Sequence, residues 1–181
     1  MRFTKDLFAA LTATALLGAL PVSAQETAAA SDASLPAMSS TIMDPEGNQL
    51  GSVELAFTES GLGVINILFT DVEPGIRGVH LHQTGLCEAP FDSAGGHLAD
   101  GKDHGVMTAT GPHPGDMPNV TVPENGIISL SYFLPNLTPE LIQDEDGTAF
   151  MIHSGADDYN SQPSGDAGNR IGCAVIAPPA G

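Results

Sequence analysis

The chain has 181 residues and a formal net charge of −17, with 22 acidic residues against five basic ones. That length suits one domain with a buried core and is short for two. The strong negative charge argues against nucleic acid and against an anionic membrane surface as partners.

The first 24 residues have the pattern of an export signal. Arg2 and Lys5 form a short positive region, an uncharged apolar run covers 7–20, and small residues precede Gln25 as at a cleavage site. The run is too short for a permanent membrane anchor, and a buried N-terminal helix fits these flanks poorly. We expect 1–24 to be a signal peptide and the mature protein to be periplasmic or extracellular, without membrane association.

Residues 25–40 are small and polar and lack hydrophobic periodicity, so we expect a flexible lead before a single domain at 41–181. Beyond the lead, apolar and polar residues alternate in short runs that are separated by turns rich in Gly, Asn and Asp. A helical turn or two is expected only at 138–143. This pattern predicts an all-β fold, a sandwich or barrel of short antiparallel strands. The alternating residues are Val53, Leu55 and Phe57; Ile65, Ile67 and Phe69; Ile128, Leu130 and Tyr132; and Phe150 with Ile152.

Two long segments, 83–119 and 154–169, interrupt this pattern. They are rich in Gly and Pro and nearly lack apolar alternation. Loops of this length inside a compact domain are usually functional or disordered. They carry or flank all six histidines of the chain, so we expect them to build a functional site.

The histidines are clustered rather than scattered. Five of the six lie between His80 and His113, and the sixth is His153. A neutral imidazole is the commonest metal ligand and suits copper and zinc, whereas any one histidine alone is as often an ordinary side chain. Because side chains alternate along a strand, His80 and His82 share one face and Val79 takes the other. The cluster therefore predicts a metal site with more than one ion.

The two cysteines, Cys87 and Cys173, both follow the expected signal peptide. An even number of cysteines in an exported protein predicts a disulfide, and two separate buried thiols are the alternative. On a loop-entropy model, a bridge that closes so long a segment stabilises the fold by about 4 to 5 kcal/mol.

Short motifs surround the histidines and the cysteines. They are GVHLH (78–82), SAGGH (93–97), HPGDMPN (113–119), HSGADDY (153–159) and GDAGNRIGC (165–173). One H-x-H motif alone is a weak signal, but these motifs in this order, with the paired cysteines, closely resemble the copper/zinc superoxide dismutases. The resemblance extends over about 40–177. It implies a Greek-key, immunoglobulin-like β-sandwich or barrel of about eight strands, with the two long loops forming the metal site.

The resemblance divides the histidines between one copper and one zinc, with His97 bridging the two ions. An all-nitrogen set suits redox-active copper, and three imidazoles with one carboxylate suit a closed, structural zinc site. The implied copper ligands are His80, His82, His97 and His153, and the implied zinc ligands are His97, His104, His113 and Asp116.

The resemblance also implies an antioxidant enzyme that converts superoxide to O₂ and hydrogen peroxide by alternate reduction and oxidation of the copper. Arg170 and His97 would be catalytic: Arg170 would attract the anion beside the copper, and His97 would release copper and take up a proton. Asp157 matches an aspartate that links a copper ligand to a zinc ligand. The alternatives are an exposed arginine at a strand start and an exposed acidic residue.

Two features depart from the family pattern. The segment from His97 to His104 is short and lacks the usual proline, which makes His104 the least secure zinc ligand. The segment 154–169 contains no lysine, and only three basic residues follow the expected signal peptide. Substrate attraction is therefore expected to come from local charges. The three basic residues are Arg77, Lys102 and Arg170.

Two other functions compete with this hypothesis. A copper-binding or copper-delivery protein without turnover would be expected to lack ligands or the arginine, and an enzyme that uses copper alone would lack the zinc ligands. All seven implied ligands and Arg170 are present, which favours the dismutase. The sequence does not decide between a monomer and a homodimer.

Overall fold

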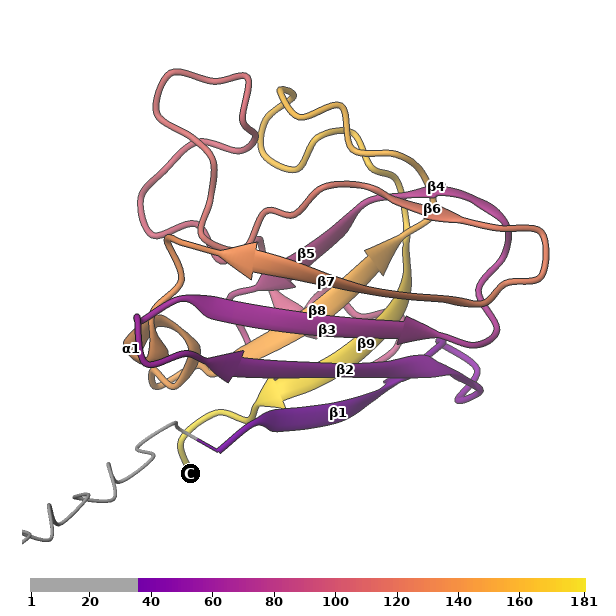
Figure 1. Ribbon diagram of the computed structural model, residues 1–181, viewed down its shortest axis with the longest axis horizontal. Coiled ribbons are helices and arrows are strands. Elements are labelled where there is room, and N and C mark those ends of the chain that lie inside the picture. The colour runs from indigo at the N-terminus through magenta and orange to yellow at the C-terminus, as the bar shows by residue number, and fades with distance from the viewer. Residues whose placement is uncertain (1–35) are drawn as a thin grey trace, which may run out of the picture. The chain divides into compact units, whose positions relative to one another are not determined.

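The computed structural model describes residues 36–181, and nearly all the regular structure in that part of the chain is β (Figure 1). The expected signal peptide, 1–24, and residues 25–35 of the expected lead lie outside the described residues. A 3-10 turn, η1 (Asp92–Ala94), and a short helix, α1 (Pro139–Ile142), accompany the strands. The strands are β1 (Met38–Met43), β2 (Gln49–Phe57), β3 (Gly63–Phe69), β4 (Gly75–Arg77), β5 (Val79–His82), β6 (Val120–Val122), β7 (Ile128–Leu134), β8 (Thr148–His153) and β9 (Arg170–Ala177).

Seven of these strands form one antiparallel sheet in the order β5-β8-β9-β1-β2-β3-β7, and β4 pairs with β6 in a small second sheet. The large sheet curls, so that β5, β8 and β9 lie behind β1, β2, β3 and β7 in the view of Figure 1. Apolar side chains that face inward from both halves make one main core. The prediction of an all-β fold of antiparallel strands is confirmed.

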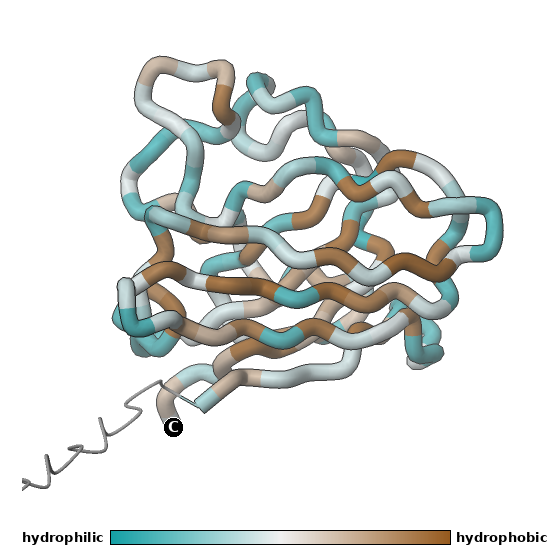
Figure 2. Tube along the Cα trace, viewed as in Figure 1, coloured by the Kyte–Doolittle hydropathy of each residue, from teal (hydrophilic) through white to brown (hydrophobic). Residues whose placement is uncertain are grey.

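The alternation along β2 and β3 explains why these residues form strands. In β3, Ile65, Ile67 and Phe69 are buried, and the residues between them are more exposed. In β2, Val53 lies opposite Ile67 and Leu55 lies opposite Ile65. Branched and aromatic side chains at period two suit a strand with one face in the core. Figure 2 shows that β3 is hydrophobic over most of its length, because apolar residues such as Leu68 also occupy its more exposed face.

β5 and β8 differ from those strands because they are buried along their whole length. Val79 and Leu81 of β5 enter the main core, so the parity of the strand places His80 and His82 on its other face. That face would be exposed in a bare sheet. The two long segments cover it, and this covering is the first step in building the site.

The long segments contain no β-strand between β5 and β6 or between β8 and β9, as the sequence predicts. They lie side by side at one end of the curled sheet (Figure 1). The backbone N–H of Met107 donates to the carbonyl of Tyr159 at 3.1 Å. Gly105, with φ +85°, lies so close to this carbonyl that any side chain there would overlap it. The two loops are therefore packed against each other.

The predicted disulfide is present between Cys87 and Cys173, whose Cα atoms are 5.8 Å apart. It joins the first long loop to β9. Both sulfurs belong to a small second apolar cluster that includes Phe91 and Met151. The bridge thus anchors one end of the loop that crosses the histidine-bearing face.

The starts of β1 and α1 show how local hydrogen bonding sets the boundaries of a strand and a helix. β1 begins at Met38, within the expected lead, because its backbone pairs with β2 and needs no apolar run of its own. The helical turn expected at 138–143 is confirmed as α1, where the Thr138 hydroxyl accepts from the Leu141 N–H at 3.4 Å and Pro139 occupies the first turn. Across residues 36–181, none of the helical structure is long and apolar enough to span a bilayer.

Phe69 provides a test of the core. Its side chain is fully buried, so we expect Phe69→Ala to lower the free energy of unfolding by about 3 to 5 kcal/mol, through lost apolar burial and the cavity left behind. Urea unfolding followed by circular dichroism measures the loss. The matched control is Phe133→Ala in β7, whose side chain is 70% exposed, and we expect a change of about 0.5 kcal/mol or less. Equal losses in the two variants would contradict this position of the core.

Candidate metal centre

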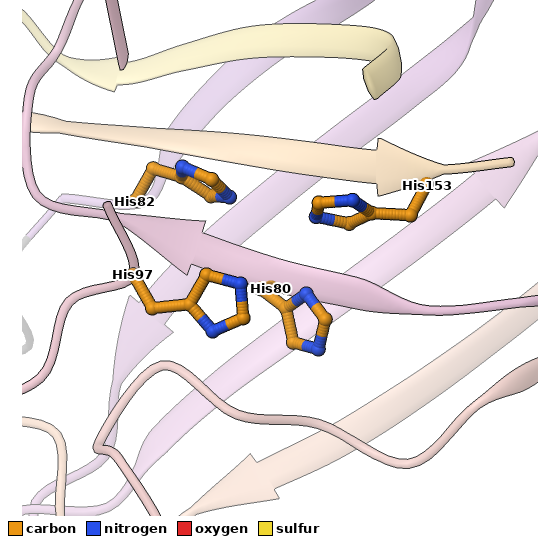
Figure 3. Close-up of side chains that lie close together, drawn as sticks. All are labelled: His80, His82, His97 and His153. Carbon is orange, nitrogen blue, oxygen red and sulfur yellow. The ribbon is translucent and has the colours of Figure 1, made fainter. Parts of the chain in front are cut away.

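Six histidines and two aspartates from distant parts of the chain converge on the covered face of β5. β5 and the end of β8 contribute three of the histidines, and the long loops contribute the other groups. Figure 3 shows four of the imidazole rings facing one another across a small space beside β5 and β8. These four belong to His80, His82, His97 and His153.

Each of these four rings has one buried nitrogen without a hydrogen-bond partner. One ligand atom from each ring lies within 4.8 Å of the others. A buried polar atom without a partner costs roughly 1 to 3 kcal/mol, so four at one point indicate a missing common partner. The unpaired atoms are His80 Nδ1, His82 Nε2, His97 Nε2 and His153 Nε2. A metal ion that prefers nitrogen ligands fits this set.

The second nitrogen of each ring is fixed by an oxygen acceptor. His82 donates from Nδ1 to the Gly95 carbonyl at 3.0 Å, and His153 donates from Nδ1 to the Gly168 carbonyl at 3.3 Å. His80 donates from Nε2 to Asp157 at 2.8 Å. Such acceptors fix the tautomer and the orientation of a metal-binding imidazole. The unpaired nitrogens therefore point inward because their ring partners are tied outward.

The first long loop reaches this position by bridging to β5. Single β-bridges pair His80 with Asp116 and His82 with His97. These contacts place the two segments of the loop on the free edge of β5, beside the histidines of that strand. A one-residue slip would turn each histidine to the opposite face, so this local pairing fixes the register of the site.

A second set of ligand atoms surrounds the carboxylate of Asp116. Three Nδ1 atoms lie near its Oδ1: His104 at 3.1 Å, and His97 and His113 at 3.2 Å each. Its Oδ2 accepts from the backbone N–H of Gly105 at 2.8 Å and of His113 at 3.0 Å. Three imidazole nitrogens and one carboxylate oxygen make a donor set that suits tetrahedral zinc. His97 presents Nδ1 to this set and Nε2 to the first.

His113 lies outside the tightest group of ligand atoms around Asp116. The second group of ligand atoms within 4.8 Å of one another comprises His80, His97, His104 and Asp116, with His80 where the sequence suggests His113. His80 enters this group because its ring lies against that of His97, with centroids 4.0 Å apart. His113 still contacts Asp116, and its Nε2 donates to the Lys102 carbonyl at 3.1 Å.

Asp157 connects the two sets. Its carboxylate is buried and accepts from His80 Nε2 at 2.8 Å and from His104 Nε2 at 3.0 Å, and the backbone N–H of Tyr159 donates to it at 2.6 Å. Gly165, with φ +68°, passes so close that a side chain there would overlap both the carboxylate and the His104 ring. The exposed position considered as an alternative from the sequence is therefore excluded.

The family model for copper/zinc superoxide dismutase (SODC) matches residues 50–176. This chain belongs to the copper/zinc superoxide dismutase family. Copper and zinc are the metals of that family, and the two donor sets fit them: four imidazoles for copper, and imidazoles with one carboxylate for zinc.

Relatives of this dismutase family come from several bacteria. "Superoxide dismutase [Cu-Zn] 2" of Aquifex aeolicus is 39% identical over 143 residues, which cover 75% of this chain and 83% of the relative. The corresponding protein of Caulobacter vibrioides is 32% identical over 142 residues, with 72% and 80% covered. The crystal structure of a SOD-like protein from Bacillus subtilis matches with a TM-score of 0.71 at 33% identity and covers 77% of this chain and 97% of that one.

Arg170, at the start of β9, is tied to the same face. Its guanidinium donates to the Phe91 carbonyl at 2.5 Å and to the Gly95 carbonyl at 2.6 Å, and Gly95 also accepts from His82. Burial is the main cause of the lowered pKa of His82 and of His153, and the charge of Arg170 adds to it. The disulfide at Cys173 holds the accepting loop against β9, so the arginine is positioned by covalent and hydrogen-bonded ties together.

Burial and hydrogen bonding shift the pKa values of four of the histidines, in opposite directions. Burial lowers the pKa of His82 to about 2, of His153 to about 3 and of His97 to about 4, so these rings are neutral at physiological pH. Burial also opposes charge on His104, but its bonds to Asp116 and Asp157 outweigh that effect and raise its pKa to about 9. Burial raises the pKa of the Asp116 and Asp157 carboxyls, but their hydrogen bonds to the histidine rings outweigh it and hold both pKa values well below the ordinary range.

Two residues that support the site were not predicted from the sequence. Asn119 and Gln162 bind the backbone of Asp157 and His104 respectively. Asn119 at least falls in one of the family motifs, which is a signal that could have pointed to it. Gln162 has no such signal, because a glutamine in a polar loop is indistinguishable from a solvated side chain until the loop is folded.

The pKa shifts predict how the stability of the metal-free protein varies with pH. Below pH 6.5 the unfolded chain takes up protons that His82, His97 and His153 refuse in the fold, so the free energy of unfolding should fall as the pH drops toward 4. His104 acts oppositely: its contribution is full below pH 6.5 and is lost as the pH rises through about 9. Each group changes stability by at most about 1.4 kcal/mol per pH unit.

Urea unfolding of the chelator-treated protein at about pH 4.5, 6.5 and 9.5 measures both limbs. His104→Gln should remove the alkaline loss and leave the acid loss in place. A metal-free stability that does not change between neutral and alkaline pH, in a protein that unfolds in one step, would contradict the charged state of His104.

Proposed function

We propose that the protein is a superoxide dismutase that converts superoxide to O₂ and hydrogen peroxide with one copper and one zinc per chain. The observation that carries this proposal is the convergence of four buried, unpartnered imidazole nitrogens beside an intact second donor set. Membership of the family supports the same activity. Superoxide is accordingly the small anionic substrate.

The proposed ligands follow the two donor sets and their shared ring. When bound, copper supplies the one-electron oxidation and reduction of superoxide, and zinc is structural. The proposed copper ligands are His80, His82, His97 and His153, and the proposed zinc ligands are His97, His104, His113 and Asp116. In both sets the ring nitrogens that face away from the metal are held by oxygen acceptors, which supports this assignment.

His97 is the proposed residue for moving a proton. Its Nε2 has no hydrogen-bond partner, while its Nδ1 lies 3.2 Å from Asp116. Burial lowers its pKa to about 4, so the ring starts neutral and can take a proton at Nε2 only as its surroundings change. Asp157 holds His80 and His104 in place on either side and takes no proton itself, because its bonds to both rings keep it ionised.

Arg170 is the proposed residue that binds the anion. It lines a cleft of about 840 Å³ together with Arg77 and five carboxylates, and the residues that line this cleft include none of the proposed copper ligands. Those carboxylates oppose a negatively charged substrate at long range, so Arg170 must act at short range, where its fixed guanidinium can donate two hydrogen bonds. The five acidic residues are Asp44, Glu46, Asp71, Glu73 and Asp92.

A copper-binding or copper-delivery protein without turnover is the second candidate. The family name alone does not exclude it, because relatives of this fold include one described only as superoxide dismutase-like. The intact second donor set and the fixed Arg170 both favour turnover, since a carrier needs neither a zinc site nor an anion-binding group. An enzyme that uses copper alone is disfavoured by the same donor set.

We also propose that the protein works outside the cytoplasm, in the bacterial periplasm or beyond it. The disulfide between Cys87 and Cys173 supports an oxidising compartment. The proposed organisation is a signal peptide at 1–24, a lead at 25–40 and the dismutase domain at 41–181.

Metal reconstitution tests the function directly. Protein stripped with chelator should be inactive on superoxide, and addition of copper and zinc should restore dismutation with about one ion of each per chain. His153→Ala should lose copper and activity but keep zinc, because His153 belongs to the first donor set alone. His113→Ala is the matched variant and should lose zinc first. A fully loaded protein without turnover would support the copper-carrier alternative instead.

Arg170→Ala tests the anion site. We expect kcat/KM to fall by about tenfold, with copper and zinc contents unchanged, because a local positive charge raises the encounter rate by at least that factor. The difference from the native protein should shrink as salt shortens the Debye length. Pulse radiolysis at two ionic strengths measures both effects. Lys102→Ala, with its exposed side chain, should give a smaller fall, and an unchanged rate would remove any role for Lys102.

A further inference from the structure

Gln162, in the second long loop, clamps the backbone of His104 in the first. Its Oε1 accepts from the His104 N–H at 2.9 Å, and its Nε2 donates to the His104 carbonyl at 2.9 Å. Only one orientation of the amide satisfies both bonds, so the side chain is fixed as a flat, two-point contact. The amide therefore makes the same pair of hydrogen bonds to His104 that the backbone of a neighbouring β-strand would make, although no strand lies beside this part of the loop.

Asn119, at the end of the first loop, makes the reciprocal contact on Asp157 in the second. Its Oδ1 accepts from the Asp157 N–H at 2.9 Å, and its Nδ2 donates to the Asp157 carbonyl at 2.8 Å. The backbone N–H of Asn119 also donates to the Tyr159 hydroxyl at 2.7 Å. Each loop therefore contributes one primary amide that grips one residue of the other loop.

The two gripped residues are bonded to each other. His104 Nε2 donates to Asp157 Oδ1 at 3.0 Å, between the two amide clamps. The segment from His97 to His104 is short, and no regular strand or helix holds its backbone. The Gln162 amide is the hydrogen-bond acceptor found for the His104 N–H in the described part of the chain. His104 is thus held from both loops. Asp116 and Thr108 of its own loop contact its ring and its carbonyl, and Gln162 and Asp157 of the second loop hold its backbone and its other ring nitrogen.

We propose that Gln162 and Asn119 are positioning residues for zinc, which fix His104 and Asp157 as a preformed pair across the two loops. This inference rests on the proposed role of His104 as a zinc ligand. The clamp compensates for the short spacing that made His104 the least secure zinc ligand in the sequence, because the neighbouring loop fixes both the N–H and the carbonyl of this residue. Zinc retention therefore depends on a residue that touches neither metal nor substrate.

The test measures zinc release from the full protein into a chromophoric chelator. Groups that orient a metal ligand change metal affinity by about 10 to 100-fold when removed, so Gln162→Ala should release zinc about tenfold faster. Gln162→Glu keeps the acceptor but loses the donor, and should also release zinc faster. Gln143→Ala removes an exposed glutamine amide away from the site and is the matched control, with unchanged release.

Cobalt in the zinc site supplies a readout that a merely structural role would not move. The visible absorption of bound Co²⁺ reports the position of its ligands, so it should change in Gln162→Ala and stay native in Gln143→Ala. Asn119→Ala combined with Gln162→Ala should accelerate zinc release by less than the product of the single effects, because both amides secure the same contact.

The inference would be overturned if Gln162→Ala matched Gln143→Ala in both zinc release and cobalt spectrum. It would also be overturned if zinc release from the double variant were accelerated by the full product of the two single effects. A native protein that releases zinc as expected but does not dismutate superoxide would refute the proposed function and leave the clamp standing. A native protein that binds no zinc at His104 would refute both.

Discussion

A buried imidazole must find a partner for each of its two nitrogens, and the rest of this structure depends on that requirement. All six rings are buried, and each has a ring nitrogen directed at an oxygen acceptor from the backbone or a carboxylate. Four rings keep their other nitrogen unpartnered at a common point. The hydrogen bonds to these acceptors thus orient the unpartnered nitrogens toward the common point. The free-energy cost of burying those polar atoms is borne by the folded protein before a metal ion binds.

The two long loops meet that requirement together. The first supplies Asp116 and three histidines, and the second supplies Asp157, which reaches the copper-side His80 and the zinc-side His104 at once. The curled sheet contributes a rigid wall on which β5 and β8 hold the remaining histidines. Strands place side chains more precisely than loops do, and the proposed copper ligands lie mainly on strands, whereas the proposed zinc ligands lie on loops.

Parts of this arrangement follow directly from sequence patterns. Alternation at period two in β2, β3 and β7 predicts strands, and two lone cysteines that follow an expected export signal predict the disulfide. The beginning of β1 at Met38 could not be predicted the same way, because its polar residues pair through the backbone. The grouping of His80, rather than His113, with His97, His104 and Asp116 also depends on ring packing that no spacing rule contains.

The sequence by itself determined the fold class, the candidate metal-binding side chains and the two loops that carry most of them, because periodicity and residue chemistry are local properties. Only the tertiary structure decided which nitrogen of each ring is free, where Arg170 is tied, and that Gln162 and Asn119 grip opposite loops. Those facts depend on contacts between residues that are tens of positions apart. A hydrogen bond of that kind is set by the path of the folded backbone, and the spacing of polar loop residues along the sequence does not show which of them will pair.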